Sequence, residues 1–182
     1  MAGIPSIVPA ININTSSGQL RTELLNTFIR LDGNLKAVPF RLFATTGPIG
    51  NSSTTETDLY TKQLNFNTLT EVGQSIQIFA TGKTNANANN KRFKLKLGTT
   101  TLFDSGNVAA NDKDWTFVGE VIANGDTGQI AYGQFTYDGS SSIVRTETGA
   151  EDLGTTLDLT LTGQGGASDD ISLYYVKGVL VI

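Results

Sequence analysis

The 182-residue sequence contains no cysteine and no histidine. The absence of cysteine excludes disulfides, thiolate nucleophiles and cysteine-based metal sites. The absence of histidine excludes imidazole general bases, Ser-His-Asp hydrolysis and histidine-ligated zinc or non-haem iron. These two absences argue against most enzyme classes, and we expect a non-enzymatic protein that carries no metal or other cofactor.

Charge and long apolar runs are also scarce. Charged residues make up 16% of the chain and the net charge is −4, so no basic surface for nucleic acid or an anionic membrane is expected. The opening MAGIPSIVPA has no Lys or Arg and is interrupted by Pro5 and Pro9, which does not fit a signal peptide. No run approaches the roughly 20 apolar residues of a membrane helix. We expect a soluble product made in a cytoplasm.

Residues 1–16 are predicted to form an extended arm, because Pro5 and Pro9 favour extended backbone in themselves and their predecessors. The arm is unusually apolar for a free tail. It is either a flexible terminus or an arm that docks on a partner, and its exposed aliphatic residues favour docking. The candidate contact residues are Ile4, Ile7, Val8, Ile11 and Ile13.

Residues 17–38 are predicted to form the one short helix. Ser16 and Gln19 match a capping box at its start, and Pro39 ends it. The helix either folds onto its own domain or forms a three-helix seam that joins protomers, and the sequence does not separate the two. Its apolar residues follow at alternating spacings of 4 and 3, as in a coiled coil: Leu24, Phe28, Leu31, Leu35 and Val38.

From Phe40 to the C-terminus the sequence predicts an all-β domain, residues 40–182. Segments such as RFKLKL (92–97) alternate apolar and polar residues, as half-buried strands do. Short Gly-, Asn- and Asp-rich turns separate these segments, which favours a sandwich or barrel over βαβ units. The chain ends on an apolar strand, so we expect truncation there to unfold the domain. Further strands are predicted at 74–80, 101–104, 115–122, 129–137, 143–146, 157–161 and 171–182.

Candidate chemistry is limited to carboxylates, lysines and aromatic rings. Most of the acids stand beside turn residues, which favours solvated turn carboxylates over a catalytic pair. Lys91, Arg92, Lys94 and Lys96 are interpreted as a solvated strand face. The acids considered are Glu120, Glu147, Glu151, Asp152, Asp112, Asp114, Asp169 and Asp170, and the rings considered for sugar stacking are Trp115, Tyr132, Tyr137, Tyr174 and Tyr175.

Several segments resemble the jelly-roll domain of tailed-bacteriophage virion proteins. They are RLFATTGPIGNSSTTETDLYTKQL (41–64), ANANNKRFKLKLGTTTLFDSG (86–106), AEDL (150–153), LTGQG (161–165) and DDI (169–171). The resemblance covers roughly residues 40–182. It implies a jelly-roll-like β-sandwich in a structural, often trimeric, virion protein, and it brings no catalytic residues.

The resemblance and the composition together lead to one expected function. We expect a capsid cement or decoration protein on the virion surface, made in the host cytoplasm. Its arm and helix would contact the major capsid protein, and the chain would form a homo-oligomer, with a trimer favoured. The alternative is a short tail or head fibre protein whose sandwich binds a host-surface glycan.

Overall fold

The computed structural model describes residues 39–66, 68–139 and 141–182, and within them it contains ten strands. The predicted arm (1–16) and helix (17–38) lie outside the described residues. The strands are β1 (Phe40–Gly50), β2 (Thr57–Leu64), β3 (Ser75–Thr84), β4 (Arg92–Leu97), β5 (Thr100–Asp104), β6 (Asp114–Ala123), β7 (Gln129–Tyr137), β8 (Ser141–Gly149), β9 (Leu157–Gln164) and β10 (Ile171–Val181).

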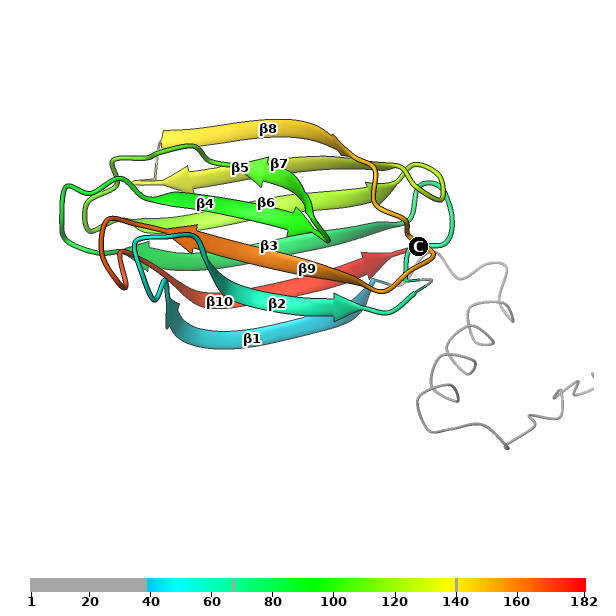
Figure 1. Cartoon of the computed structure of the whole chain (residues 1–182), viewed down its shortest axis with the longest axis horizontal. Helices are drawn as coiled ribbons and strands as arrows, with labels where there is room; N and C mark the ends of the chain where they lie inside the picture. The colour runs from blue at the N-terminus through cyan, green and yellow to red at the C-terminus, as the bar shows by residue number, and fades with distance from the viewer. Residues whose placement is uncertain (1–38, 67, 140) are drawn as a thin grey trace, which may run out of the picture. The chain divides into compact units, whose positions relative to one another are not determined.

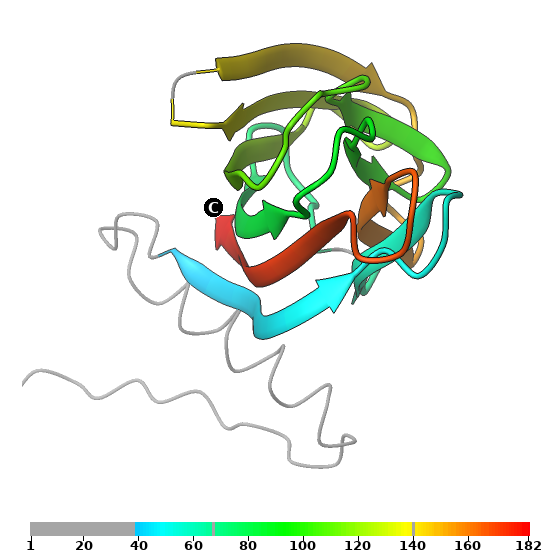
Figure 2. The same ribbon diagram turned by 90° about the vertical axis from the view of Figure 1, so that its left-hand side faces the viewer.

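The strands form two antiparallel sheets that face each other as two layers (Figures 1 and 2). The six-stranded sheet has the order β1-β10-β3-β6-β7-β8, and the four-stranded sheet has the order β2-β9-β4-β5. The all-β sandwich prediction is therefore confirmed. The C-terminal strand β10 lies between β1 and β3 inside the larger sheet, so its loss would leave β1 without a partner strand and β3 paired only with β6.

Alternation along the strands supplies the core between the two layers. In β4 the side chains of Phe93, Leu95 and Leu97 are fully buried, while Lys94 and Lys96 point to the other side and stay partly exposed. This alternation confirms the orientation predicted from RFKLKL. The same pattern buries Trp115 and Phe117 of β6, so one side of each strand faces the opposite sheet.

The centre of the core is an aromatic cluster around Phe93. Its ring centroid lies 4.9 Å from Phe117, 5.2 Å from Trp115 and 5.2 Å from Phe135. Such tilted and offset pairs add to the free energy gained from burying the rings. The cluster joins β4 of the smaller sheet to β6 and β7 of the larger sheet.

The prediction for Lys91, the residue just before β4, is wrong. Lys91, interpreted as part of a solvated strand face, has no exposed surface. It precedes β4 and pairs with Val108 through an isolated β-bridge, so its side chain lies under the connection from β3 to β4 instead of on the strand face.

Candidate interaction face

In its central part, over β10, β3, β6, β7 and β8, the outer side of the six-stranded sheet carries little charge. Arg41 on β1, and Lys83 and Asp114 at the ends of β3 and β6, flank this part. Residues that sit opposite each other on neighbouring antiparallel strands share a side of the sheet, so the register defines three adjoining rows. We call these rows the outer face. They are Lys177–Phe79–Val118–Gln134–Val144, Val179–Gln77–Glu120–Tyr132–Thr146, and Tyr175–Thr81–Thr116–Thr136.

Apolar side chains on the outer face are open to solvent. Val118 is 51% exposed, Val144 48% and Tyr132 40%. They come from three neighbouring strands, β6, β8 and β7, so they gather in one half of the sheet. Solvent-exposed apolar groups that gather in this way mark surfaces used for binding.

The two charged residues of the outer face already have interactions within the sheet. The Nζ atom of Lys177 lies 5.7 Å from the ring centroid of Phe79, within cation–π range. Glu120 accepts hydrogen bonds from Ser75 Oγ at 2.6 Å and from Gln77 Nε2 at 3.3 Å. A partner that covered this surface would therefore not leave either charge without an interaction.

The outer side of the four-stranded sheet has the opposite character. Glu56 pairs with Lys94 and, at 3.5 Å, with Lys96, and Arg92 pairs with Asp104. Burial opposes ionisation of Glu56, but the hydrogen bond and charge of Lys94 and the charge of Lys96 lower its pKa. The pKa of Asp104 is likewise lowered by Arg92 against the effect of burial. This side carries ion pairs, which favour contact with water over contact with protein.

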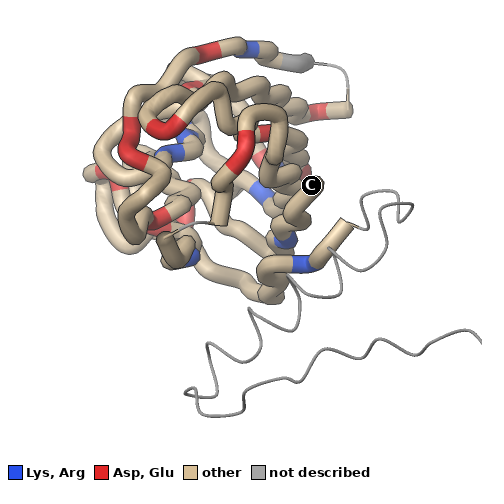
Figure 3. Tube along the Cα trace, turned by 90° about the vertical axis from the view of Figure 1, so that its right-hand side faces the viewer, with Lys and Arg blue, Asp and Glu red and all other residues tan. Residues whose placement is uncertain are grey.

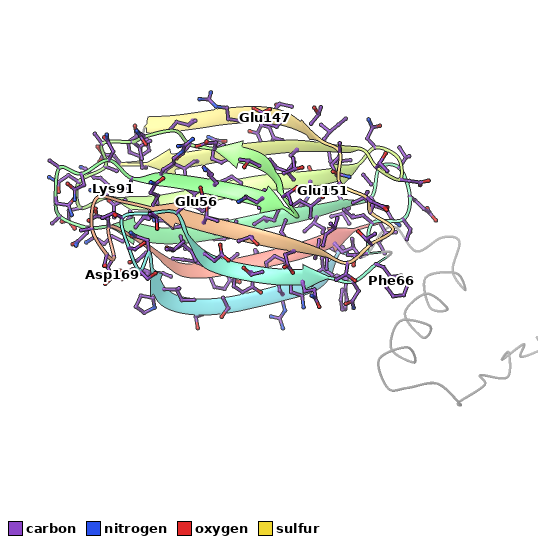
Figure 4. All side chains as sticks on the ribbon, viewed as in Figure 1. Glu56, Phe66, Lys91, Glu147, Glu151 and Asp169 are labelled. Atoms are coloured by element: carbon purple, nitrogen blue, oxygen red, sulfur yellow. The ribbon has the colours of Figure 1, made fainter. Side chains whose placement is uncertain are left out.

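The candidate acids are not gathered into one site. Asp112 pairs with Lys83 at 2.8 Å, Glu120 lies on β6 and Glu147 on β8. Glu151 lies at the opposite end of the sandwich from Asp169, as Figure 4 shows. Asp170 is fully buried, so the prediction of a solvated turn carboxylate is wrong for this residue.

The aromatic residues considered for sugar stacking lie in different environments, some in the core and some exposed. Trp115 is 1% exposed and belongs to the core, so the suggestion that it stacks on a sugar is wrong. Tyr137 packs against Phe135 and Tyr175 lies beside Phe79. Tyr132 and Tyr174 remain exposed, Tyr132 on the outer face.

A pocket of about 300 Å³ lies at the end of the sandwich viewed in Figure 3, where several loops carry acidic residues. The loops between β2 and β3, β6 and β7, and β8 and β9 form it, and its lining includes Leu69, Glu71, Val72, Asp126 and Asp152. In the described part of the chain, no group of three or more acidic side chains has the arrangement of a metal site. Within the same ranges, no helix has the length and apolar character needed to cross a membrane.

The predicted contact residues Ile4, Ile7, Val8, Ile11, Ile13, Leu24, Phe28, Leu31 and Leu35 lie outside the described residues, so they stay predictions. Sequence reasoning missed the outer face as a unit. The alternation of each strand indicated which residues point outward, but the order of the strands brings those residues together.

Comparison with known proteins does not assign the chain to a family. A scan against protein-family models gives no match, and a search of the curated proteins gives none either.

Proposed function

We propose that the chain is a non-enzymatic virion structural protein, a cement or decoration protein of a phage capsid. The arm and helix contact the major capsid protein, and the sandwich projects from the shell and contacts neighbouring copies of the same chain. Each bound copy would stabilise the assembled shell by mass action. The observation that carries the proposal is the outer face, which has the composition of a protein-binding surface.

We also propose that the sandwich is a jelly roll with an inserted hairpin. If β7 and β8 are taken as the insertion, eight strands remain, in the sheets β1-β10-β3-β6 and β2-β9-β4-β5. Eight antiparallel strands in two facing sheets are the architecture of jelly rolls, which occur in viral capsid and lectin domains. The hairpin would then extend one sheet and widen the outer face.

The size of the six-stranded sheet supports contact with another copy of the chain. Strands of about ten residues are about 33 Å long, and six strands span about 29 Å, so the whole outer side of this sheet, with the outer face at its centre, has a flat area of about 900 Å². A stable interface buries about 800 Å² on each partner. Interface centres are poor in charge and rich in aromatic residues, and the rows with Val118, Tyr132 and Phe79 fit that description.

Localisation on purified virions tests the proposed place of the protein. Antibody labelling spread evenly over the head is expected for a cement protein. In a second test, deletion of residues 1–16 is expected to abolish binding to capsid shells. Shells that the deletion variant still saturates would show that the arm is not the anchor.

Sedimentation of the full chain tests the outer face. Val118→Lys puts a charge at the centre of the outer face, in the row from Lys177 to Val144, and is expected to shift the chain from oligomer to monomer. Thr101→Lys, an exposed residue of β5 in the other sheet, is the matched control and should leave the oligomer intact. A monomeric wild-type chain, or an oligomer unaffected by Val118→Lys, would contradict the proposed contact.

A fibre protein that binds a host-surface glycan is the second proposal. The exposed rings of Tyr132 and Tyr174 favour it, because tyrosine combines an apolar ring with a polar tip. Labelling confined to the tail tip would support this function, as would glycan binding lost on Tyr174→Ala. Labelling spread evenly over the head would contradict a tail-fibre function.

A further inference from the structure

A lysine, an asparagine and an aspartate meet at the end of the sandwich opposite the pocket. Lys91 precedes β4, Asn87 lies in the loop between β3 and β4, and Asp170 precedes β10. Lys91 and Asp170 have no exposed surface, and Asn87 is half-buried. Figure 4 places Lys91 at the same end as Asp169, the neighbour of Asp170.

The lysine amine lies against the side-chain amide of the asparagine. Lys91 Nζ is 2.7 Å from Asn87 Oδ1 and 2.9 Å from the backbone oxygen of the same residue. Because a carbonyl bond is about 1.2 Å long, Nζ is at most about 3.9 Å from the amide carbon Cγ. This is close to the separation of about 3–3.5 Å from which a nucleophile attacks.

Two further groups act on the same amide. The backbone N–H of Asn89 donates to Asn87 Oδ1 at 3.0 Å, so it is placed to stabilise negative charge on that oxygen during attack. Asn87 Nδ2 donates to Asp170 Oδ1, which places a carboxylate at the nitrogen that would leave. Nucleophile, oxyanion donor and acid–base group therefore surround one carbonyl carbon.

We propose that Lys91 and Asn87 form an intramolecular isopeptide bond with Asp170 as the acid–base group. The Nζ–Cγ bond forms and the Cγ–Nδ2 bond breaks. Two protons pass from Nζ to Nδ2. Once Nζ has bonded to Cγ, both nitrogens are attached to one carbon beside Asp170 Oδ1, which already accepts from Nδ2, so this carboxylate can take each proton from Nζ and give it to Nδ2. The lysine ammonium and the asparagine amide thus become a secondary amide and a released ammonium ion, and no oxidant, metal or other reactant is consumed.

The buried environment favours Lys91 as the nucleophile and Asp170 as the proton acceptor. Burial lowers the pKa of Lys91, against the opposing effect of the Asp170 charge, which increases the neutral, nucleophilic form of the amine. Burial alone would raise the pKa of Asp170, but hydrogen bonds from Asn87, Asn89 and the backbone of Ala167 lower it. Asp170 is therefore ionised and able to accept a proton.

Peptide mapping of the purified full-length protein tests the proposal. Trypsin cleaves after lysine but not after an acylated lysine. We expect a tryptic peptide spanning Thr84–Arg92, lighter than its sequence mass by one ammonia, with fragment ions that join Lys91 to Asn87. An unmodified Thr84–Lys91 peptide would overturn the proposal. A succinimide at Asn87 also loses ammonia but leaves Lys91 open to trypsin, so that result would overturn it as well.

Variants test whether the bond needs Asp170 or only the closeness of Lys91 to Asn87. Lys91→Met and Asp170→Asn are expected to retain the ammonia, while Lys96→Met, on the exposed side of β4, is the matched control and should still lose it. A synthetic peptide spanning Thr84–Arg92 contains the lysine and asparagine without Asp170 and should stay unmodified. If Asp170→Asn folds and still forms the bond, Asp170 is not the acid–base group. The wild-type peptide decides the bond itself even if a variant fails to fold.

Discussion

Replacing Glu151 is expected to destabilise the fold, because one of its carboxylate oxygens holds the turn between β4 and β5. Oε1 accepts hydrogen bonds from the backbone N–H groups of Thr99 and Thr100 at 2.8 and 2.9 Å. It also accepts from their hydroxyl groups at 2.9 and 2.8 Å. The backbone of Glu151 is itself held by the side-chain amide of Gln129. Glu151 therefore ties the β8–β9 connection to a turn in the other sheet.

The magnitude follows from these four contacts. A hydrogen bond to a charged group contributes about 1.5–3 kcal/mol, but four donors share one oxygen here and water reaches the site. We therefore expect Glu151→Ala to lower the free energy of unfolding by about 2 kcal/mol in total. With a urea dependence of about 2 kcal/mol per M, the midpoint would fall by about 1 M. The fluorescence of Trp115, the only tryptophan and a core residue, reports the transition.

The matched control is Glu147→Ala on the exposed part of β8, which should change stability by less than about 0.5 kcal/mol. Equal midpoints for Glu151→Ala and Glu147→Ala would refute the role of the carboxylate.

The same contacts predict a dependence on pH. Burial raises the pKa of Glu151, but the hydrogen bonds from Thr100 and Thr99 lower it below its ordinary value of 4.5. A carboxyl group with a lower pKa in the folded state stabilises the fold fully above its unfolded pKa. This contribution is lost as pH falls through the folded pKa. The stability difference between wild type and Glu151→Gln should therefore be constant near neutral pH and shrink below pH 4.5.

Three further substitutions test other contacts. Asn51→Ala removes a buried amide that donates to the backbone of Ser53 and Ala167 and accepts from the Ile171 N–H; unfolding in urea should show a loss of about 2–3 kcal/mol, and a loss below 0.5 kcal/mol would contradict it. Phe93→Ala opens a cavity in the aromatic cluster and should cost about 3–5 kcal/mol by the same assay, whereas a loss under about 1 kcal/mol would mean that the cluster collapses around the gap. Gly82→Ala would place a Cβ 1.9 Å from the Ser172 backbone oxygen and 2.5 Å from the Trp115 ring. We therefore expect a lower melting temperature and an altered near-UV circular dichroism signal from Trp115. A wild-type melting temperature and spectrum would show that β10 moves aside without cost.

The strands that sequence predicted best are those with one buried side and one solvated side. RFKLKL alternates without interruption, and its burial follows the alternation residue by residue. The first strand, β1, gave no such pattern because its pairing with β10 shifts register twice, between Arg41 and Phe43 and between Thr46 and Ile49. Each shift changes which residues face the core, so a regular period is absent from the sequence itself.

The polar cluster around Lys91 was beyond prediction for a different reason. Asn87 and Asp170 are 83 positions apart in the chain and meet because β10 pairs with β3, which brings the two loops to one end of the sandwich. An Asn-rich loop followed by a lysine is typical of a solvated connection. The sequence around Asn87 and Lys91 gives no local signal that the carboxylate of Asp170 is buried beside them.

The contrast between the two sheet surfaces bears on how the sandwich is used in an assembly. Partly exposed ion pairs such as Glu56 with Lys96 contribute about 0–1 kcal/mol to stability, so stability alone does not explain why they gather on one sheet. Covering them with protein would remove the charges from water at a cost of several kcal/mol for each ion. The outer face of the other sheet has only Glu120 and Lys177, and both keep their interactions within the sheet when covered. The free energy of desolvation therefore favours association through the six-stranded sheet and leaves the ion-paired sheet facing water.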